Sequence, residues 1–200
     1  MKTLILETSS EKGCLVLAEK SRPIAVQPLS GGPELSKRLA WEIDALLKRH
    51  AFKPELVAVG TGPGSYTGIR VGTAIAKALS YGWQIPLIGF CSLKAFSPPT
   101  DGPFAVLSDA KMGGLYVLFG ERKKGEFSFE EPRLLAPSDP LLQRFSCFAS
   151  PHPDAVRKRG SYPGNWFETA PDPALLALSV DCQFRTQGFI PLELTYLSSP

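Results

Sequence analysis

Residues 57–72 read VAVGTGPGSYTGIRVG, and this stretch decides the fold. A short apolar run ends in a glycine-rich turn, and the turn leads into a helix rich in small residues. Glycine reaches backbone conformations that are closed to other residues, and it lets a neighbouring segment or a ligand approach the main chain closely. Amide groups in the first turn of a helix also make an anion site possible. The pattern therefore predicts a strand–turn–helix unit with a close backbone contact.

The turn does not match the common phosphate-binding patterns. No lysine follows it, as a P-loop would require. After Gly62 and Gly64 the next glycine is Gly68, one residue too late for the dinucleotide pattern G-x-G-x-x-G. Ser65 resembles the serine of a nucleophile elbow, but its flanking glycines are displaced by one residue. We therefore assign no catalytic residue here and expect Ser65 to cap the helix.

Composition indicates an ordinary globular protein. The chain has 200 residues, a hydrophobic share of 44%, a charged share of 20% and a formal charge of +3. This weak positive charge neither requires nor excludes nucleic acid, and the basic run at 157–159 is expected to be a solvated loop. No apolar run is long enough for a membrane helix, and the first residues lack a signal-peptide pattern. We expect a soluble, cytoplasmic protein with reduced, mostly buried thiols at Cys14, Cys91, Cys147 and Cys182.

The spacing of apolar residues predicts an α/β protein with a mixed sheet and helices packed on it. Strands are expected at 2–6, 14–18, 23–29, 56–59 and 85–90, and helices at 34–50, at 66–81 and briefly from Ser92.

The second half of the chain begins like the first. A strand at 104–109 ends in an acid, as the first strand does, and strands at 115–119 and 127–129 follow across polar turns. This parallel predicts an internal duplication, with one lobe at 1–99 and another at 100–200. After Pro132 the pattern becomes irregular except for a helix at 173–187 and a turn or two within 151–162, so the second lobe is predicted to be reduced.

Two acids end the equivalent strands of the predicted lobes. Glu7 and Asp109 would face a cleft, where they could bind a metal–phosphate unit or act as acid and base. Acids at strand ends also serve simply as turn or capping residues. No metal site is predicted, because His50 and His152 are far apart in the chain and form no ligand pair.

The two predicted helices of the first lobe carry possible contact residues. Trp41 lies on an otherwise polar face of helix 34–50, which is typical of an interface anchor or of a contact with a loop of the same chain. Gly68 and Gly72 allow a close approach to helix 66–81, either by a partner or by the protein's own sheet.

Several motifs together resemble one family. Residues 62–79 read GPGSYTGIRVGTAIAKAL, residues 5–9 read ILETS, residues 85–89 read IPLIG and residues 109–116 read DAKMGGLY. They resemble the TsaB (YeaZ) family of bacterial proteins of tRNA threonylcarbamoyladenosine (t6A) synthesis, which is related to the glycoprotease family. The chain departs from the family pattern at Gly114, where that pattern has an acid.

The resemblance implies the actin/Hsp70/sugar-kinase fold of two related lobes. It also implies a non-catalytic scaffold and activator that pairs with a TsaD-type enzyme and works with a TsaE-type ATPase. That complex transfers a threonylcarbamoyl group to N6 of adenosine 37 in tRNAs reading ANN codons. No cofactor is expected to bind this chain tightly, whereas ATP or ADP could lie at the partner interface. The implied interface uses the helices at 34–50 and 66–81, with Leu39, Trp41, Ile43, Gly68, Ile69, Gly72 and Ala76.

Other functions remain open at this point. An ATP-dependent small-molecule kinase would use the cleft with Glu7, Thr8 and Asp109. A protease, which the family's older name implies, lacks a credible nucleophile and metal ligands. A homodimer through the same two helices is the third alternative.

Overall fold

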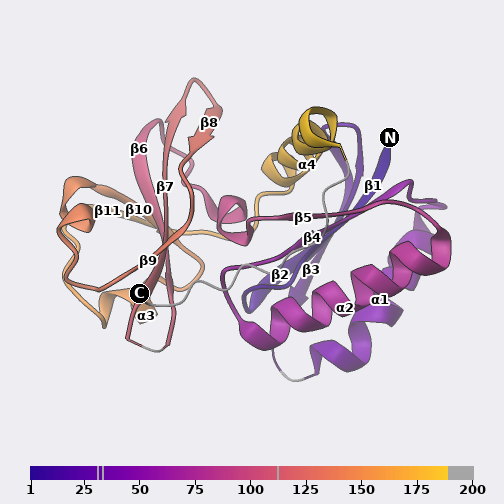
Figure 1. Cartoon of the computed structure of the whole chain (residues 1–200), viewed down its shortest axis with the longest axis horizontal. Coiled ribbons are helices and arrows are strands. Elements are labelled where there is room, and N and C mark those ends of the chain that lie inside the picture. The colour runs from indigo at the N-terminus through magenta and orange to yellow at the C-terminus, as the bar shows by residue number, and fades with distance from the viewer. Residues whose placement is uncertain (31, 33, 112, 189–200) are drawn as a thin grey trace. The chain divides into compact units, whose positions relative to one another are not determined.

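The structure is a computed structural model that describes residues 1–30, 32, 34–111 and 113–188. It divides into two compact units (Figure 1). The first holds Met1–Ser92 together with helix α4 (Pro173–Gln187), and the second holds Leu93–Ala170.

The first unit is a 5-stranded mixed sheet in the order β3-β2-β1-β4-β5. The central strand β1 is antiparallel to β2 and parallel to β4. Helices α1 and α2 lie side by side on one face of the sheet, and α4 lies on the other face (Figure 1). The bounds are β1 (Lys2–Glu7), β2 (Lys12–Glu19), β3 (Arg22–Ser30), α1 (Leu35–Arg49), β4 (Leu56–Gly60), α2 (Tyr66–Trp83) and β5 (Leu87–Phe90). The 3-10 helix η1 (Ser92–Phe96) spans the division between the two units in the sequence.

The core of the first unit fills the space between the sheet and helices α1 and α2. Each large aliphatic side chain buried there contributes about 2 kcal/mol of apolar transfer free energy. The helix residues follow the predicted period of 3.6, and the strand residues alternate, as an amphipathic helix on a sheet requires. The cluster includes Leu4, Leu6, Leu35, Leu39, Ile43, Leu46, Val57, Val59 and Ala76.

The second unit repeats the strand order of the first. Its 6-stranded sheet runs β11-β10-β6-β7-β8, with β9 paired to β7. Strand β6 is antiparallel to β7 and parallel to β10, as β1 is to β2 and β4, so the predicted duplication is confirmed in the topology. The bounds are β6 (Gly102–Asp109), β7 (Leu115–Lys123), β8 (Glu126–Phe129), β9 (Arg133–Leu135), η2 (Pro140–Arg144), β10 (Cys147–Ser150), α3 (Pro153–Arg157) and β11 (Asn165–Glu168).

The sequence analysis missed three strands of the second unit, namely β9, β10 and β11. Strands β10 and β11 are each 4 residues long and lie in proline- and glycine-rich surroundings, so their pattern is short. They are held by a core in which Phe148 stacks on Trp166 with ring centroids 5.0 Å apart. The second sheet is therefore complete, and the reduction affects the helices, since only the 5-residue α3 lies between β10 and β11.

Helix α4 has the predicted bounds but packs with the first unit. Ser21 Oγ donates to Asp181 Oδ2 at 3.0 Å, and Gln183 Nε2 donates to Gly89 O at 2.8 Å. The division into units therefore differs from the expected lobes, because it falls after Ser92 and moves α4 out of the second half. None of the helices in the described part of the chain is long and apolar enough to cross a membrane.

Candidate functional site

Glycines spaced four residues apart line the groove in which residues 7–9 lie. A Cβ atom added at any of these glycines would overlap an atom of that segment. The overlaps involve the Glu7 carboxylate at Gly60, Ser9 O at Gly64, Thr8 O at Gly68 and Thr8 Oγ1 at Gly72. Only glycine fits at such close approaches of backbone to helix. The contact that the glycine pattern predicts is therefore made within the chain itself.

Hydrogen bonds join the same segment to the start of α2. Thr8 Oγ1 donates to Gly68 O at 2.9 Å, and Ser65 N donates to Ser9 O at 2.6 Å. Ser65 Oγ accepts from Gly68 N at 3.3 Å, so the predicted helix cap is confirmed. Two amide groups at this helix start are thus already bonded inside the protein. We name residues 7–9 together with Gly60, Gly64, Gly68 and Gly72 the glycine cradle.

Glu7 is sealed inside the cradle. Its side chain is fully buried, and Oε1 accepts from Ser9 N at 2.6 Å. Burial raises the pKa of the Glu7 carboxyl, and hydrogen bonds from Ser9 and Ser92 offset this only in part. Glu7 pairs with Cys14 across β1 and β2, and burial together with the Glu7 charge raises the pKa of the Cys14 thiol. Burial that disfavours the charged carboxylate and closes it off from solvent makes Glu7 a poor ligand for a metal–phosphate unit.

Asp109 ends β6 as Glu7 ends β1, but its surroundings differ. Its Oδ1 and Oδ2 accept from Arg159 Nε and Nη2, each at 3.1 Å. Oδ1 also accepts from Lys111 N at 2.8 Å, which closes a tight turn. Asp109 therefore acts as the turn residue that the sequence left as an alternative. Of the three expected cleft residues, Glu7 and Thr8 are engaged in the glycine cradle and Asp109 in an ion pair.

The residues expected to contact a partner divide sharply by exposure. Trp41 is 70% exposed on α1. The other six lie in the interior of the first unit, where they pack between the helices and the sheet and present no surface to a partner. The exposed fraction is 2% or less for Leu39, Ile43, Ile69 and Ala76, and Gly68 and Gly72 are also buried. The expectation is corrected for these six, because their small or apolar side chains fit the core as well as an interface.

The outward face of α1 and α2 carries large apolar side chains instead. Tyr81 is 81% exposed and Tyr66 is 55% exposed, and the Arg70 guanidinium lies 3.8 Å from the centroid of the Tyr66 ring. Trp83 at the end of α2 is 39% exposed. We name Trp41, Tyr66, Arg70, Lys77 and Tyr81 the helix-pair face. At about 100° per residue, Arg70, Lys77 and Tyr81 share one side of α2, whereas Thr73 on that side is buried.

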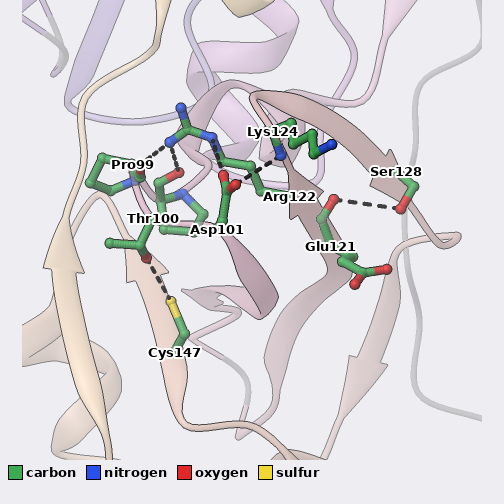
Figure 2. A network of polar contacts seen from close by, with 9 residues as sticks. Pro99, Thr100, Asp101, Glu121, Arg122, Lys124, Ser128 and Cys147 are labelled. Carbon is green, nitrogen blue, oxygen red and sulfur yellow. Dashed lines mark hydrogen bonds and ion pairs between the residues drawn. The ribbon is translucent and has the colours of Figure 1, made fainter.

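The second unit has a polar network at the start of its sheet (Figure 2). The Arg122 guanidinium donates to Pro99 O and lies 3.4 Å from Asp101 Oδ1. Asp101 Oδ2 accepts from Lys124 N at 2.8 Å. These contacts fasten the segment before β6 to the β7–β8 hairpin and are structural.

Potential metal-ligating side chains form no cluster within the described part of the chain. There, no group of three or more His, Cys, Asp or Glu side chains is placed to hold a metal ion. The thiols are less buried than expected, because only Cys14 is fully buried while Cys91 and Cys147 are half-buried and Cys182 is exposed.

Comparisons with known proteins agree with the motifs. A family model described as "TsaD: tRNA N6-adenosine threonylcarbamoyltransferase" matches residues 17–127, more than half of the chain. The tRNA threonylcarbamoyladenosine biosynthesis protein TsaB of Haemophilus influenzae is 29% identical over 137 residues, which cover 64% of this chain and 57% of that protein. An uncharacterized protein of Mycobacterium leprae is 44% identical over 62 residues, 31% of this chain and 17% of that protein. The aligned part thus spans less than two thirds of either relative.

A solved structure extends the match to the fold as a whole. YeaZ from Pseudomonas aeruginosa superposes with a TM-score of 0.76 and 20% sequence identity, covering 93% of both chains. The chain therefore has the YeaZ fold, in which two mixed sheets are flanked by helices.

Proposed function

This chain belongs to the TsaB (YeaZ) group of the tRNA N6-adenosine threonylcarbamoyltransferase family, and on this premise we propose that it is the non-catalytic subunit of a t6A-synthesising complex. Its task is to bind a TsaD-type enzyme and hold it in the active arrangement. Transfer of threonylcarbamoyl to N6 of adenosine 37 in tRNAs reading ANN codons is then the work of the partner. A TsaE-type ATPase and the tRNA join through the complex.

The observation that carries this proposal is the helix-pair face. Exposed tryptophan and tyrosine side chains near the centre of a surface supply most of the binding energy of many protein interfaces. Trp41 and Tyr81 are 70% and 81% exposed, and they come from two helices that lie side by side on one sheet face (Figure 1). Burial of both rings by a partner helix would remove a large apolar area from water.

The surroundings of the acids support a subunit without bond chemistry of its own. Glu7 is fully buried, and Asp109 is held by Arg159 at 3.1 Å. A kinase-like reaction would need these carboxylates free to bind a metal–phosphate unit. Any ATP or ADP is therefore placed, in this proposal, at the partner interface, and we expect the isolated chain to show no rise in melting temperature with ATP.

Affinity for the TsaD-type protein of the same organism tests the proposal. We expect a stable complex, and we expect tRNA modification by that enzyme to require this chain. Trp41→Ala should weaken the complex by about 2 kcal/mol, roughly 30-fold in Kd, as for an interface hot spot. Calorimetric titration measures the affinity, and circular dichroism verifies the fold.

A second pair of variants separates a blocked surface from a damaged fold. Ala78 on α2 and Ala174 on α4 are both exposed helix residues of the first unit, on opposite faces of the sheet (Figure 1). Ala78→Arg should obstruct the partner, and Ala174→Arg should leave binding unchanged. Equal binding by both, with the folds intact, would contradict the proposed interface.

A further inference from the structure

Charge is distributed unequally between the two helices of the helix-pair face. Helix α2 contains no Asp or Glu, and neither does any position from 56 to 100. It nevertheless presents Arg70 and Lys77 to the outside. On α1, by contrast, two exposed cations are balanced locally: Lys37 Nζ lies 3.0 Å from Glu34 Oε1, and Lys48 Nζ lies 2.8 Å from Asp44 Oδ2.

The cations of α2 lie between its aromatic residues. Tyr66, Arg70, Lys77 and Tyr81 fall within one stripe of the helix, at about 100° per residue. A partner that covers both tyrosines must also cover the two cations between them. Removing a cation from water without a counter-charge costs several kcal/mol. Within the described residues Lys77 makes no ion pair that would offset this cost.

We propose that the partner surface seated on α2 is acidic, with carboxylates opposite Lys77 and apolar side chains opposite Tyr66 and Tyr81. This inference rests on the proposed function and specifies the chemistry of the partner. Carboxylates there would form charge-assisted hydrogen bonds as the rings are buried, and they would speed encounter by electrostatic steering.

RNA is the other polyanion that an aromatic and basic face could bind, and the observations favour a protein. Only two cations lie along the α2 stripe, whereas nucleic-acid surfaces gather many. Exposed alanines at 74 and 78 on α2 leave room for the backbone of a partner helix.

A charge reversal at Lys77 tests the inference on the full chain with the TsaD-type protein. Lys77→Glu should weaken the complex about 30-fold or more, mainly through a slower association and a faster dissociation measured by surface plasmon resonance. Lys53→Glu is the matched control, because Lys53 is exposed in the loop after α1 and the net charge changes equally. The wild-type affinity should fall as salt rises from about 0.05 M to about 0.5 M.

Each outcome has one meaning. If wild-type chain binds but Lys77→Glu binds as tightly as Lys53→Glu, the acidic partner surface is wrong and the proposed function stands. If the wild-type chain does not bind the TsaD-type protein at all, the proposed function fails, and this inference fails with it. If Lys77→Glu instead abolishes binding of free tRNA and leaves the protein complex intact, the face is an RNA surface. Rescue of Lys77→Glu by a carboxylate-to-lysine change in the partner would establish the pairing.

Discussion

Glu7 and Asp109 end the central strands of two sheets that share one strand order, but the environments of the two carboxyl groups differ. In the first unit, β4 leads into α2, and the glycines of that strand and helix close over Glu7 and its neighbours. In the second unit, β10 leads into α3, and Arg159 just after it binds Asp109 at 3.1 Å. One acid is thus buried, which raises its pKa, while the other is paired with a cation.

This difference shows what a repeated topology does and does not preserve. The pairing of strands is repeated because both units need the same mixed sheet to bury an apolar core. The surroundings of each acid depend on the helix that follows the neighbouring parallel strand, which is α2 after β4 and α3 after β10. These two helices differ in length and in composition. Equivalent positions therefore need not form a catalytic pair.

The largest effect is expected from filling the glycine cradle. At Gly72 a Cβ atom would collide with Thr8 Oγ1, whereas Gly82 on the same helix has open space around it. Gly72→Ala should lower the free energy of unfolding by about 3 kcal/mol or more, because helix and strand must move apart. Gly82→Ala should be neutral or stabilising by about 0.5 kcal/mol. Urea denaturation measures both, and equal stabilities would show that the cradle is not tightly packed.

An intermediate effect is expected from removing the Glu7 charge. Because its folded-state pKa is raised, the folded protein holds this proton more tightly than the unfolded chain does. The Glu7 carboxyl therefore makes its full contribution to the free energy of unfolding below the unfolded-state pKa of about 4.5. This contribution is lost as the pH rises through the folded-state pKa, and the free energy of unfolding falls by at most about 1.4 kcal/mol per pH unit.

Glu7→Gln removes this loss, since the amide stays neutral. The stability of Glu7→Gln relative to wild type should therefore increase from about pH 4.5 upward. Thermal or urea unfolding at a series of pH values gives the difference in free energy of unfolding between Glu7→Gln and wild type. The contributions of the other carboxylates are the same in both proteins and cancel in this difference curve. A flat difference curve would mean that Glu7 is ionised normally in the folded protein.

The smallest effect is expected at the second strand end. Asp109→Asn weakens the pair with Arg159, whose partners are partly exposed, so the cost should be about 1 kcal/mol and should shrink with added salt. The comparison variant is Glu130→Gln, which breaks the exposed Arg133 pair of the same unit and should cost less. If Asp109→Asn changed stability with pH as strongly as Glu7→Gln, the two strand ends would be alike after all.

The sequence predicted the first unit well because its elements are long and periodic. The bounds of α2 differ from the prediction only at its end, and α4 matches. Strands β10 and β11 were not predicted, because four residues are too few to show an alternating hydrophobic pattern. Their pairing also depends on contacts between residues that are distant in the sequence.

The site was predicted in part. The motif correctly indicated a close contact at the glycine turn, but a period of 3.6 residues tells only which residues share a face. It does not tell which face meets the sheet, so a partner contact and a contact within the chain both remained open at Gly72, which lies against Thr8. At Gly114, where the family pattern has an acid, a Cβ atom would lie 2.8 Å from Leu134 Cδ1, so a larger residue there requires the end of the Leu134 side chain to move.

The central claim is that this chain binds and does not catalyse, and a double variant tests it most directly. Glu7→Gln combined with Asp109→Asn should be measured in tRNA modification by the complex reconstituted with the TsaD-type enzyme, beside wild type. With folding and partner affinity verified, we predict a modification rate within about twofold of wild type, because neither carboxylate takes part in the transition state. A loss of about a hundredfold or more in a folded, fully assembled complex would instead make these acids part of the reaction.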